Sequence, residues 1–269
     1  MQAQFSGSLA SVDGAITLAS EAKIPATDEG LLRGDGAFEV MRVYDGRPYA
    51  FEKHLQRLER SALNLRLPLD LEAVRADANR LLAHAGAGPD HELLRIVVTR
   101  GGRRLLLTEP MPAMPERTRL ATVTYSPTRV LDGVKSLSYA ANMLAGRLAR
   151  ERGFDEALLV TPDDHVLECP TASFFWARGG GLLTPPLEDH VLESITRRLI
   201  LAVSGAREQP TSLAELAGAE EAFIASSVRE VLPVHRIEAH ELPAPGPLTR
   251  ATAQAVSAEV KAALERAGG

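Results

Sequence analysis

The stretch Phe38-Glu-Val-Met-Arg-Val-Tyr-Asp-Gly-Arg-Pro-Tyr-Ala-Phe51 predicts two strands joined by a tight turn. Its residues alternate around Asp45-Gly46, a dipeptide that favours the primed two-residue turns of β-hairpins. A weaker alternation runs from Gln4 to Leu18 around Asp13-Gly14. We therefore expect two β-hairpins near the start of the chain.

The hydrophobic period changes after this stretch. Apolar residues then recur in steps of three and four, at Leu55, Leu58, Ala62 and Leu65. Such steps place the side chains on one stripe, which predicts a helix over residues 51–67. A second helix is expected over 71–85, capped by Asp70 and ended by Gly86, and a buried strand over 93–99. The first part of the chain is thus predicted to be α+β.

A proline-rich stretch over residues 110–115 predicts a linker, and we place a domain boundary near Met114. A chain of 269 residues is long enough for two modest cores, so we expect domains over 1–113 and 114–269. The second is expected to hold a strand at 120–125, a helix at 139–152, a hairpin at 157–168 turning at Pro162-Asp163-Asp164, a strand at 173–177, a helix from Glu193, a strand at 222–225 and a helix at 248–267.

Composition excludes several classes of partner. The formal net charge of −5 lacks the basic excess that nucleic-acid binding needs, which favours a small soluble substrate. No stretch approaches the roughly 18 apolar residues of a membrane span, and residues 1–9 lack the pattern of a secretory signal. The single cysteine, Cys169, cannot form an internal disulfide, and no Cys or His cluster has zinc-site spacing. We expect a cytoplasmic protein without a structural metal.

Lysine chemistry has few candidates, because only Lys23, Lys53, Lys135 and Lys261 are present. Lys135 lies in Leu131-Asp-Gly-Val-Lys-Ser-Leu-Ser-Tyr139, with a valine before it. Partial burial at such a place would lower the pKa of the amine and free it as a nucleophile. Taken alone, the same position also fits an exposed surface lysine.

Further blocks of sequence give this lysine a context. They are Asp28-Glu-Gly-Leu-Leu-Arg-Gly-Asp-Gly-Ala-Phe-Glu39, His54-Leu-Gln-Arg-Leu-Glu-Arg-Ser61, Lys135 with Tyr139 and Asn142, Gly153-Phe-Asp-Glu-Ala157, Glu168, Thr184-Pro185, Ile195-Thr-Arg197 and Ser226-Ser-Val-Arg-Glu-Val-Leu-Pro233. In their order and spacing the chain resembles the fold-type IV pyridoxal-phosphate enzymes over nearly its whole length. That family includes branched-chain and D-amino acid aminotransferases, (R)-amine transaminases and aminodeoxychorismate lyase.

The resemblance implies an α/β (α+β) fold with a small N-terminal domain and a larger C-terminal domain, whose β-barrel-like core is flanked by helices. It implies pyridoxal 5′-phosphate as cofactor, held as a Schiff base on Lys135. The same lysine would act as the base and acid that moves a proton between the substrate Cα and the cofactor.

The resemblance also implies which residues bind the phosphate. Arg57 would grip it with a planar guanidinium, and its place at the flank of the helix stripe supports this. Ile195 and Thr196 stand at a helix start, where backbone N–H groups favour a phosphate, and Ser226 and Ser227 would add donors. Without the resemblance, Arg57 fits a solvated helix arginine and the others fit ordinary helix starts.

Two residues are implied for the cofactor ring. Glu168 would pair with the pyridine nitrogen and keep it protonated, although glutamate is seldom buried and a strand-end surface residue is the alternative. Tyr139 follows Lys135 by four residues, so in a helix both would project from one face and the hydroxyl could reach the phenolate oxygen. The alternative for Tyr139 is a core tyrosine with a solvated hydroxyl.

Some positions depart from the family pattern. The family commonly has asparagine at the place of Ser173, and proline-glycine where Glu193-Ser194 stand here. The second change could alter the shape of the phosphate loop. Cys169 is expected to be a small buried apolar residue, and His54 a packing residue rather than a base.

Phe38, Val40 and Arg42 share one face of their strand by its two-residue period, and the corresponding strand lines the substrate pocket in the family. We expect Arg42, Arg103 or Arg104 to capture a substrate carboxylate. The Phe-x-Val-x-Arg pattern favours a transaminase with an amino donor and a 2-oxo acid, and slightly favours D-amino acids or (R)-amines. Aminodeoxychorismate lyase, an L-branched-chain aminotransferase and a catalytically idle cofactor-binding module are the alternatives. The resemblance also implies a homodimer.

Overall fold

The computed structural model describes residues 7–266, which form two compact units. The first contains residues 7–113 together with Val134–Ser138, and the second contains Met114–Gly133 and residues 139–266. The segment with Lys135 thus belongs to the first unit, whereas the predicted boundaries assigned it to the second. Two hydrogen bonds explain this, because the amide of Phe38 donates to the Lys135 carbonyl at 3.0 Å and that of Leu137 to the Gly36 carbonyl at 2.9 Å.

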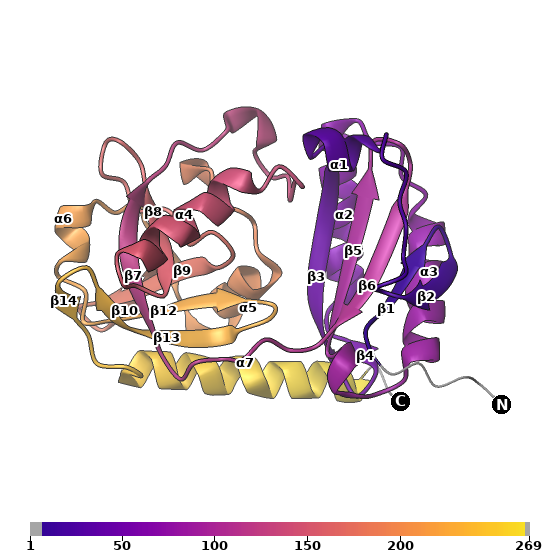
Figure 1. Ribbon diagram of the computed structural model, residues 1–269. Coiled ribbons are helices and arrows are strands. Elements are labelled where there is room, and N and C mark those ends of the chain that lie inside the picture. The colour runs from indigo at the N-terminus through magenta and orange to yellow at the C-terminus, as the bar shows by residue number, and fades with distance from the viewer. Residues whose placement is uncertain (1–6, 267–269) are drawn as a thin grey trace. The chain divides into compact units, whose positions relative to one another are not determined.

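The first unit is built on an antiparallel sheet of six strands (Figure 1). In spatial order they are β2 (Ala15–Leu18), β1 (Leu9–Val12), β6 (Arg104–Glu109), β5 (Leu93–Thr99), β3 (Gly36–Tyr44) and β4 (Arg47–Pro48). The hairpin predicted around Asp13-Gly14 is confirmed, with φ of 50° and 91° at the two turn residues. Residues 4–6 of that prediction lie outside the described residues.

The second predicted hairpin is shorter than expected. β3 turns at Asp45 and Gly46, whose φ angles are 49° and 79°, but β4 has only two residues. Pro48 has no N–H with which to extend the ladder, and the chain enters a helix at Phe51.

Helices cover one face of this sheet. They are α2 (Phe51–Leu65) and α3 (Leu71–Ala85). The unit also contains α1 (Glu29–Arg33), none of whose residues is buried, and a 3-10 turn, η1 (Pro89–His91). α2 packs on β3, and α3 packs on β6 and β1. The side chain of Asp70 accepts a hydrogen bond from the amide of Ala73 at 2.9 Å, as expected of an N-cap. Both predicted helices are confirmed, although α2 ends at Leu65 rather than at 67.

The two faces of β3 differ in what they contact. Ala37, Met41 and Val43 point into the apolar core beneath α2 and α3. Glu39 shares their face by the two-residue period of a strand and is fully buried. A carboxylate in an apolar layer needs partners, and α2 supplies them.

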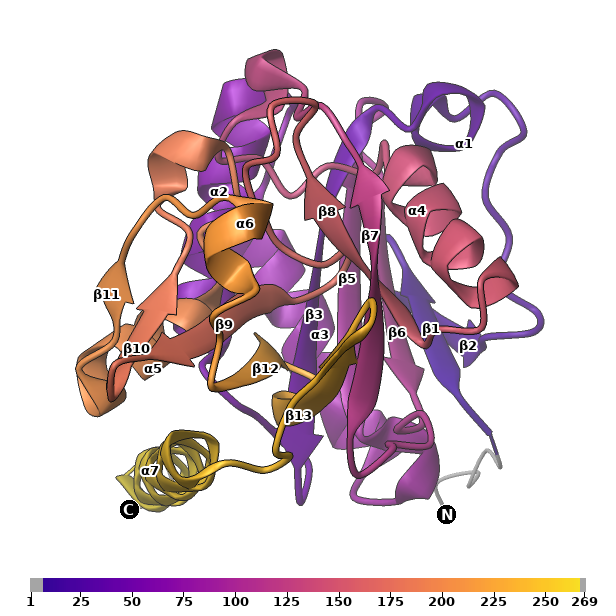
Figure 2. The ribbon, with the colours of Figure 1, turned by 90° about the vertical axis from the view of Figure 1, so that its left-hand side faces the viewer.

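The second unit is built on a mixed, curled sheet that forms a half-barrel (Figure 2). In spatial order its strands are β11 (Arg207–Glu208), β10 (Gly181–Thr184), β9 (Ser173–Arg178), β12 (Glu221–Ser226), β13 (Glu230–Ile237), β7 (Thr118–Thr124) and β8 (Glu156–Val160), with β14 (His240–Glu241) paired to β13. β8 pairs in parallel with β7, and β7 with β13. The expected barrel-like core is therefore present as an open, curled sheet.

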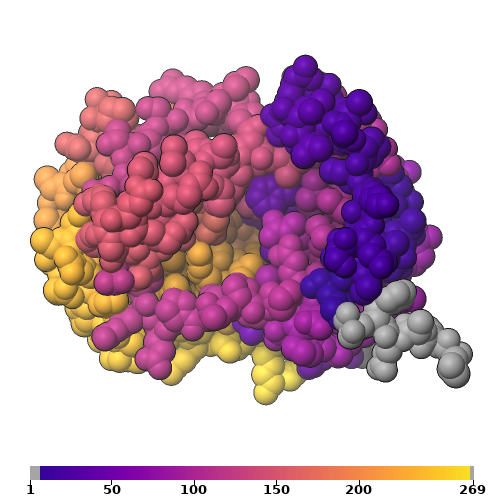
Figure 3. All heavy atoms as spheres, viewed as in Figure 1, coloured from indigo at the N-terminus to yellow at the C-terminus, as the bar shows by residue number. Residues whose placement is uncertain are grey.

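Helices flank this sheet. They are α4 (Ala140–Glu151), α5 (Ile195–Ser204), α6 (Leu213–Leu216) and α7 (Pro247–Arg266), with 3-10 turns η2 (Arg129–Leu131) and η3 (Leu187–Asp189). α4 packs on β7 and β8 and lies at the surface of the second unit in Figure 3. α5 and α7 pack on each other and on β12. Two stacked aromatic pairs lie on opposite faces of the sheet at β9. They are Phe174 with Trp176 on one face and Phe175 with Phe223 of β12 on the other.

The helix predicted over 139–152 is confirmed as α4, Ala140–Glu151, whereas the return limb of the hairpin predicted over 157–168 needs a correction. Residues 135–139 are not helical, because α4 begins only at Ala140. The hairpin expected over 157–168 is present, because the amide of Leu159 donates to the Glu168 carbonyl and that of Leu167 to the Leu159 carbonyl, both at 2.9 Å. Its return limb is not a regular strand, however, and Val160 and Val166 form an isolated bridge. The amide of Val166 donates instead to the carbonyl of Thr211 at 2.8 Å. Residue 267, the expected end of the last helix, lies outside the described residues. None of the helices between residues 7 and 266 is long and apolar enough to cross a membrane.

Candidate functional site

Lys135 is half-buried and is held by β3 and α2 of the first unit. Its carbonyl accepts from the amide of Phe38 at 3.0 Å, and its own amide donates to Oγ of Ser61 at 3.1 Å. Its Nζ lies 4.3 Å from the centroid of the Phe38 ring, within cation–π range. Two elements therefore fix the backbone of Lys135 and limit where its amine can lie.

Glu39 of β3 forms a buried ion pair with Arg57 of α2. The carboxylate accepts hydrogen bonds from Nε of Arg57 at 2.7 Å and from Nη2 at 2.6 Å, and Nδ1 of His54 lies 2.7 Å from Oε2. The side chains of Glu39 and His54 are 0% exposed and that of Arg57 is 4% exposed. Arg57 is thus not a solvated helix arginine, and the three polar groups satisfy one another.

The electrostatics of this cluster follow from burial and charge. Burial alone would raise the pKa of Glu39, but the charge and hydrogen bonds of Arg57, helped by His54, hold it at about 2. Burial lowers the pKa of His54, and the positive charges of Arg57 and Lys135 add to this against the opposing effect of Glu39. At neutral pH Glu39 is therefore ionised, and a neutral His54 donates its Nδ1–H to it. His54 is a buried hydrogen-bonding residue, which agrees with the expectation that it is not a base.

α2 connects this ion pair to Lys135. His54, Arg57 and Ser61 follow one another at helical spacing and face the same way, and Ser61 is the residue that binds the Lys135 amide. The first unit thus supplies a defined amine and a defined guanidinium from adjoining supports. Such a donor set fits a small cofactor that carries an aldehyde and a phosphate on one ring.

In the second unit, Glu168 is half-buried and fixed by backbone contacts. Its Oε1 accepts from the amide of Leu192 at 2.9 Å, and its carbonyl accepts from the amide of Leu159 at 2.9 Å. Burial raises the pKa of Tyr125, and the negative charge of Glu168 raises it further. A fixed, half-buried carboxylate has the chemistry needed to pair with a protonated ring nitrogen.

Tyr139 and Asn142 converge on the turn that follows Glu168. The hydroxyl of Tyr139 donates to the carbonyl of Pro170 at 2.7 Å, and Nδ2 of Asn142 donates to the same oxygen at 3.2 Å. Because residues 135–139 are not helical, the argument that placed Lys135 and Tyr139 on one helical face does not hold. Tyr139 is instead the residue that precedes the first turn of α4.

Arg229 joins the turn after Glu168 to the turn between β12 and β13. Its Nη1 donates to Oγ1 of Thr171 at 2.9 Å, and its Nη2 lies 3.0 Å from Oε2 of Glu156. Its amide donates to Oγ of Ser226 at 3.1 Å. Ser226 thus accepts a hydrogen bond inside its own turn, and the half-buried Ser227 follows it there.

Ile195 and Thr196 form the buried first turn of α5. Ser194 is the N-cap, and its side chain accepts from the amide of Arg197 at 3.2 Å. The Glu193-Ser194 departure from the family pattern therefore supplies a side-chain cap. One of the amides at this helix start is satisfied by the protein itself.

The three residues predicted to share a face of β3 lie on the same side of that strand. Phe38 is buried, and Val40 and Arg42 are half-buried on the side of β3 opposite to the core residues. The guanidinium carbon of Arg42 lies 4.7 Å from the centroid of the Tyr44 ring. The two-residue period thus predicted the neighbours on this strand correctly.

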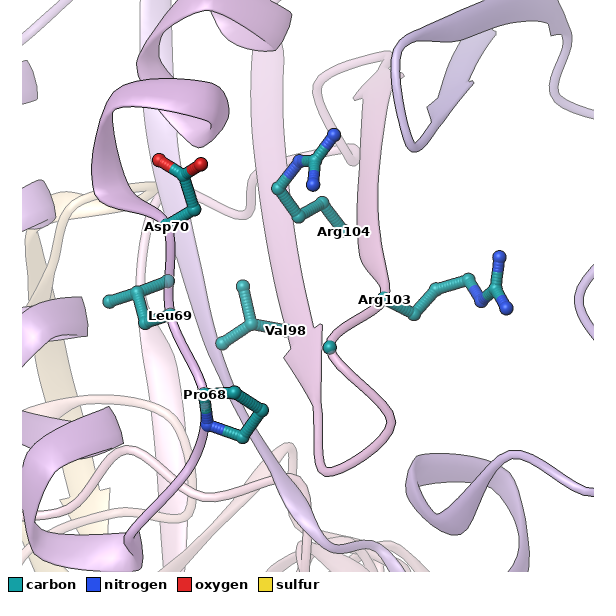
Figure 4. Close-up of a pocket in the computed structure, with 7 residues that line it drawn as sticks. Pro68, Leu69, Asp70, Val98, Arg103 and Arg104 are labelled. Carbon is teal, nitrogen blue, oxygen red and sulfur yellow. The ribbon is translucent and has the colours of Figure 1, made fainter.

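Arg103 and Arg104 adjoin a pocket of about 470 Å³ in the first unit. Its lining residues are Pro68, Leu69, Asp70, Val98, Gly102, Arg103 and Arg104. Arg103 is directed away from Pro68, Leu69 and Val98 (Figure 4) and forms an ion pair with Asp13. Nε of Arg104, the first residue of β6, lies 2.8 Å from Oδ2 of the buried Asp77. Both arginines thus have carboxylate partners within their own unit. These carboxylates neutralise the positive charge that would otherwise attract a substrate carboxylate.

Sequence reasoning did not identify Glu39, Tyr125 or Arg229 as parts of these clusters. Glu39 could have been found, because it occupies a core-facing position between Ala37 and Met41 and so requires a cationic partner. Arg229 carried no local signal, since its partners lie far away in the sequence. Among residues 7–266, no group of three or more His, Cys, Asp or Glu side chains could hold a metal ion.

Comparison with known proteins gives the site a family context. The model of the class IV amino-transferase family matches residues 36–237. A bifunctional aminodeoxychorismate lyase and D-amino acid transaminase of Mycobacterium tuberculosis is 30% identical over 285 residues, covering 93% of this chain and 97% of the relative.

Two solved structures span further members. The branched-chain aminotransferase of Thermoproteus uzoniensis with norvaline has a TM-score of 0.85 at 27% identity, with 97% of each chain covered. A hypothetical aminotransferase from Mycobacterium tuberculosis, in its α-ketoglutarate- and PMP-bound form, has a TM-score of 0.83 at 27% identity, with coverage of 94% and 98%. The fold is therefore shared with aminotransferase structures over nearly the whole chain.

Proposed function

The chain belongs to the class IV aminotransferase family, and on that premise we propose that it uses pyridoxal 5′-phosphate, bound through Lys135, to transfer an amino group from an amino acid to a 2-oxo acid. Bound cofactor supplies an aldehyde for the amine and a ring that accepts the electron pair released at the substrate Cα. The protein supplies the groups that hold the ring and move the proton.

Lys135 would bind the aldehyde through Nζ, and the same Nζ would hold and return the proton of the substrate Cα as base and then acid. Arg57 binds the phosphate, and Ile195, Thr196, Ser226 and Ser227 add N–H and O–H donors to it. Support for Arg57 comes from its burial and its fixed guanidinium.

Glu168 pairs with the pyridine nitrogen, which its anchoring by the Leu192 amide supports. A carboxylate there keeps the nitrogen protonated and the ring electron-poor. The hydroxyl of Tyr139 donates a hydrogen bond to the phenolate oxygen of the ring. For this role the hydroxyl must give up its hydrogen bond to the Pro170 carbonyl.

The observation that carries the proposal is the support of Lys135. Of the four lysines in the chain, it is the one whose backbone is held by both β3 and α2, next to the buried Glu39–Arg57 pair. A nucleophilic amine works best where the fold fixes its approach to the carbonyl carbon.

A direct test is borohydride reduction after incubation with the cofactor, followed by mass spectrometry of peptides. We expect a pyridoxyl group on Lys135 in the wild-type protein and in the control Lys261→Ala, which alters an exposed lysine of α7. Lys135→Ala should carry none. Unmodified Lys135 in a folded, cofactor-treated wild type would refute the assignment.

Substrate preference is the finer part of the proposal. The pattern of Phe38, Val40 and Arg42 favours D-amino acids or (R)-amines, with Arg42 as the candidate partner of the substrate carboxylate. Turnover of D-alanine that requires 2-oxoglutarate would support this, whereas turnover of L-leucine alone would favour the branched-chain activity.

A second candidate is 4-amino-4-deoxychorismate lyase activity, which the bifunctional relative favours. The two activities need the same cofactor and differ in whether a 2-oxo acid is required. Release of pyruvate from aminodeoxychorismate without added 2-oxoglutarate would identify the lyase. Both activities in one preparation would match the pairing found in that relative.

We also propose that the protein is a cytoplasmic homodimer, as the family resemblance implies. Sedimentation equilibrium should give twice the chain mass of 28.9 kDa. A mass of 28.9 kDa across micromolar concentrations would exclude the dimer.

A further inference from the structure

We propose that Glu39 is a positioning residue for the cofactor phosphate and that it acts through Arg57. The inference rests on the proposed function, because it concerns how the chain prepares Arg57 for that phosphate. It starts from the buried ion pair of Glu39 and Arg57, because burying two charges costs desolvation energy and a buried pair often adds no net stability.

The geometry of the pair is side-on. Nε and Nη2 of Arg57 lie on one edge of the guanidinium, and both donate to Glu39, to Oε1 at 2.7 Å and to Oε2 at 2.6 Å. Two parallel hydrogen bonds fix the plane of a guanidinium and thereby the direction of all its other N–H groups. The position of Arg57 is therefore set before any ligand binds.

His54 fixes the carboxylate in turn. Its Nδ1 lies 2.7 Å from Oε2, so that Glu39 is held by three donors from two residues of α2. Without Glu39, Arg57 would be a cation in an apolar layer with fewer partners, and its long side chain would regain several rotamers. Ordering these rotamers would then reduce the free energy of phosphate binding.

The negative charge of Glu39 also affects phosphate binding, and it opposes the benefit of a fixed Arg57. Glu39 is ionised and places a negative charge close to the proposed phosphate position, which weakens the attraction of Arg57 for the anion. A purely electrostatic effect would therefore make Glu39→Gln bind phosphate more tightly. A positioning effect makes it bind more weakly, so the direction of the change separates the two.

The experiment compares two ligands that differ only in the phosphate, pyridoxal 5′-phosphate and pyridoxal. Their dissociation constants are measured by absorbance and fluorescence titration of the apo-protein, without any substrate. The preference of the wild type for the phosphorylated form should fall by about tenfold to a hundredfold in Glu39→Gln, as expected when a charge-assisted pair is broken. Affinity for pyridoxal itself should change little.

Two further variants control for a general structural effect. Glu59→Gln removes an exposed carboxylate from the same helix and should retain the full preference. Glu39→Asp keeps the charge but is too short to hold both Nε and Nη2, so its preference should lie between those of the wild type and Glu39→Gln. It also settles the question if Glu39→Gln does not fold, which circular dichroism will reveal.

Two results would overturn the inference while leaving the proposed function intact. One is an unchanged preference in both Glu39 variants, and the other is an increased preference in Glu39→Gln. An equal loss of affinity for both ligands would assign Glu39 a structural role only. Failure of the wild type to bind either ligand would instead count against the proposed function.

Discussion

At the scale of single residues, burial decides which side chains can carry chemistry. Glu39 and Cys169 are both almost fully buried, but only for the carboxylate do cationic partners outweigh burial: burial and the charge of Glu156 raise the pKa of the Cys169 thiol by more than the charge of Arg229 lowers it. The cysteine lies among apolar neighbours and stays neutral. A buried position thus stabilises one ion and suppresses the other, depending on whether a neighbouring cation outweighs the cost of desolvation.

The first prediction concerns acid stability. The pKa of Glu39 is about 2 in the folded protein against an ordinary 4.5, so its pairing contributes stability above pH 4.5 that is lost as the pH falls towards 2. The difference corresponds to about 3 kcal/mol. Urea unfolding from pH 5 to pH 2.5 should show a steeper loss of stability in the wild type than in Glu39→Gln. A parallel loss in the two proteins would show that Glu39 does not titrate in this window.

The second prediction concerns Cys169, which is 1% exposed. Burial raises the pKa of its thiol well above the ordinary value, so the reactive thiolate is scarce. A thiol reagent such as dithionitrobenzoate should leave the native protein unmodified at pH 8 and modify it at once in urea. Because Cys169 is the single cysteine of the chain, Cys169→Ser provides a blank. Rapid modification of the native protein would contradict its burial.

At the scale of elements, the second unit depends on turns that hold one another. Arg229 reaches from the β12–β13 turn to Thr171, in the turn after Glu168, and to Glu156 at the start of β8. Pro170, in the same turn, receives Tyr139 and Asn142 from the start of α4. The β12–β13 turn and the start of α4 therefore both bind the turn at residues 169–172, between Glu168 and β9.

The third prediction tests this connection. Arg229→Ala removes the contacts to Thr171 and Glu156 and leaves a nearly buried carboxylate without this partner, so the free energy of unfolding should fall by about 1–3 kcal/mol. Arg229→Lys should recover only part of it, since an ammonium cannot reproduce both contacts. Thermal and urea unfolding measure the change. Arg147→Ala, on the exposed face of α4, is the control and should be near neutral.

How far elements could be predicted depended on whether their signals were local. α3 has its apolar stripe, its N-cap Asp70 and its terminal Gly86 within one stretch, and its predicted bounds are confirmed. β6 was missed, because Leu105-Leu106-Leu107 is apolar on both faces and shows no alternation. The hairpin after β8 was predicted, but its return limb is not a regular strand, since the amide of Val166 bonds to the distant Thr211. Non-local hydrogen bonds leave no periodic trace.

At the scale of the whole chain, the same limit applies to the candidate site. A lysine with a valine before it and an arginine at the flank of a helix stripe were identifiable from spacing and resemblance. That Lys135 belongs with residues 7–113 was not, because the association depends on the bridge between Ala37 and Ser136 and the hydrogen bonds beside it. Proline composition marks where a chain leaves a unit, but it carries no information on where the chain returns.

The last prediction concerns Gly36, whose missing side chain leaves space for the segment Val134–Ser138 to pack on the first unit. A Cβ at Gly36 would lie 2.4 Å from the carbonyl oxygen of Val98 and 2.5 Å from Cδ1 of Leu137, so the returning segment packs where a side chain would otherwise be. Gly36→Ala must relieve both contacts, by a backbone shift between β3 and β5 and by displacement of the Leu137 side chain, at a cost of about 1–3 kcal/mol. Gly88→Ala is a matched control, because its nearest neighbour, Cδ2 of His91, lies at 3.8 Å.

Thermal unfolding and hydrogen exchange together show whether the larger displacement in Gly36→Ala is at Leu137 or at β5. If Leu137 is displaced, the amides of Phe38 and Leu137 lose protection, since they bond to Lys135 and Gly36. If β5 shifts, protection is lost along β5 and retained at those two amides. We expect the first result, because the 134–138 segment is held by few contacts whereas β5 is paired on both sides. Full protection and an unchanged melting temperature would mean that the segment is not packed against Gly36, and that Lys135 is not held by the first unit.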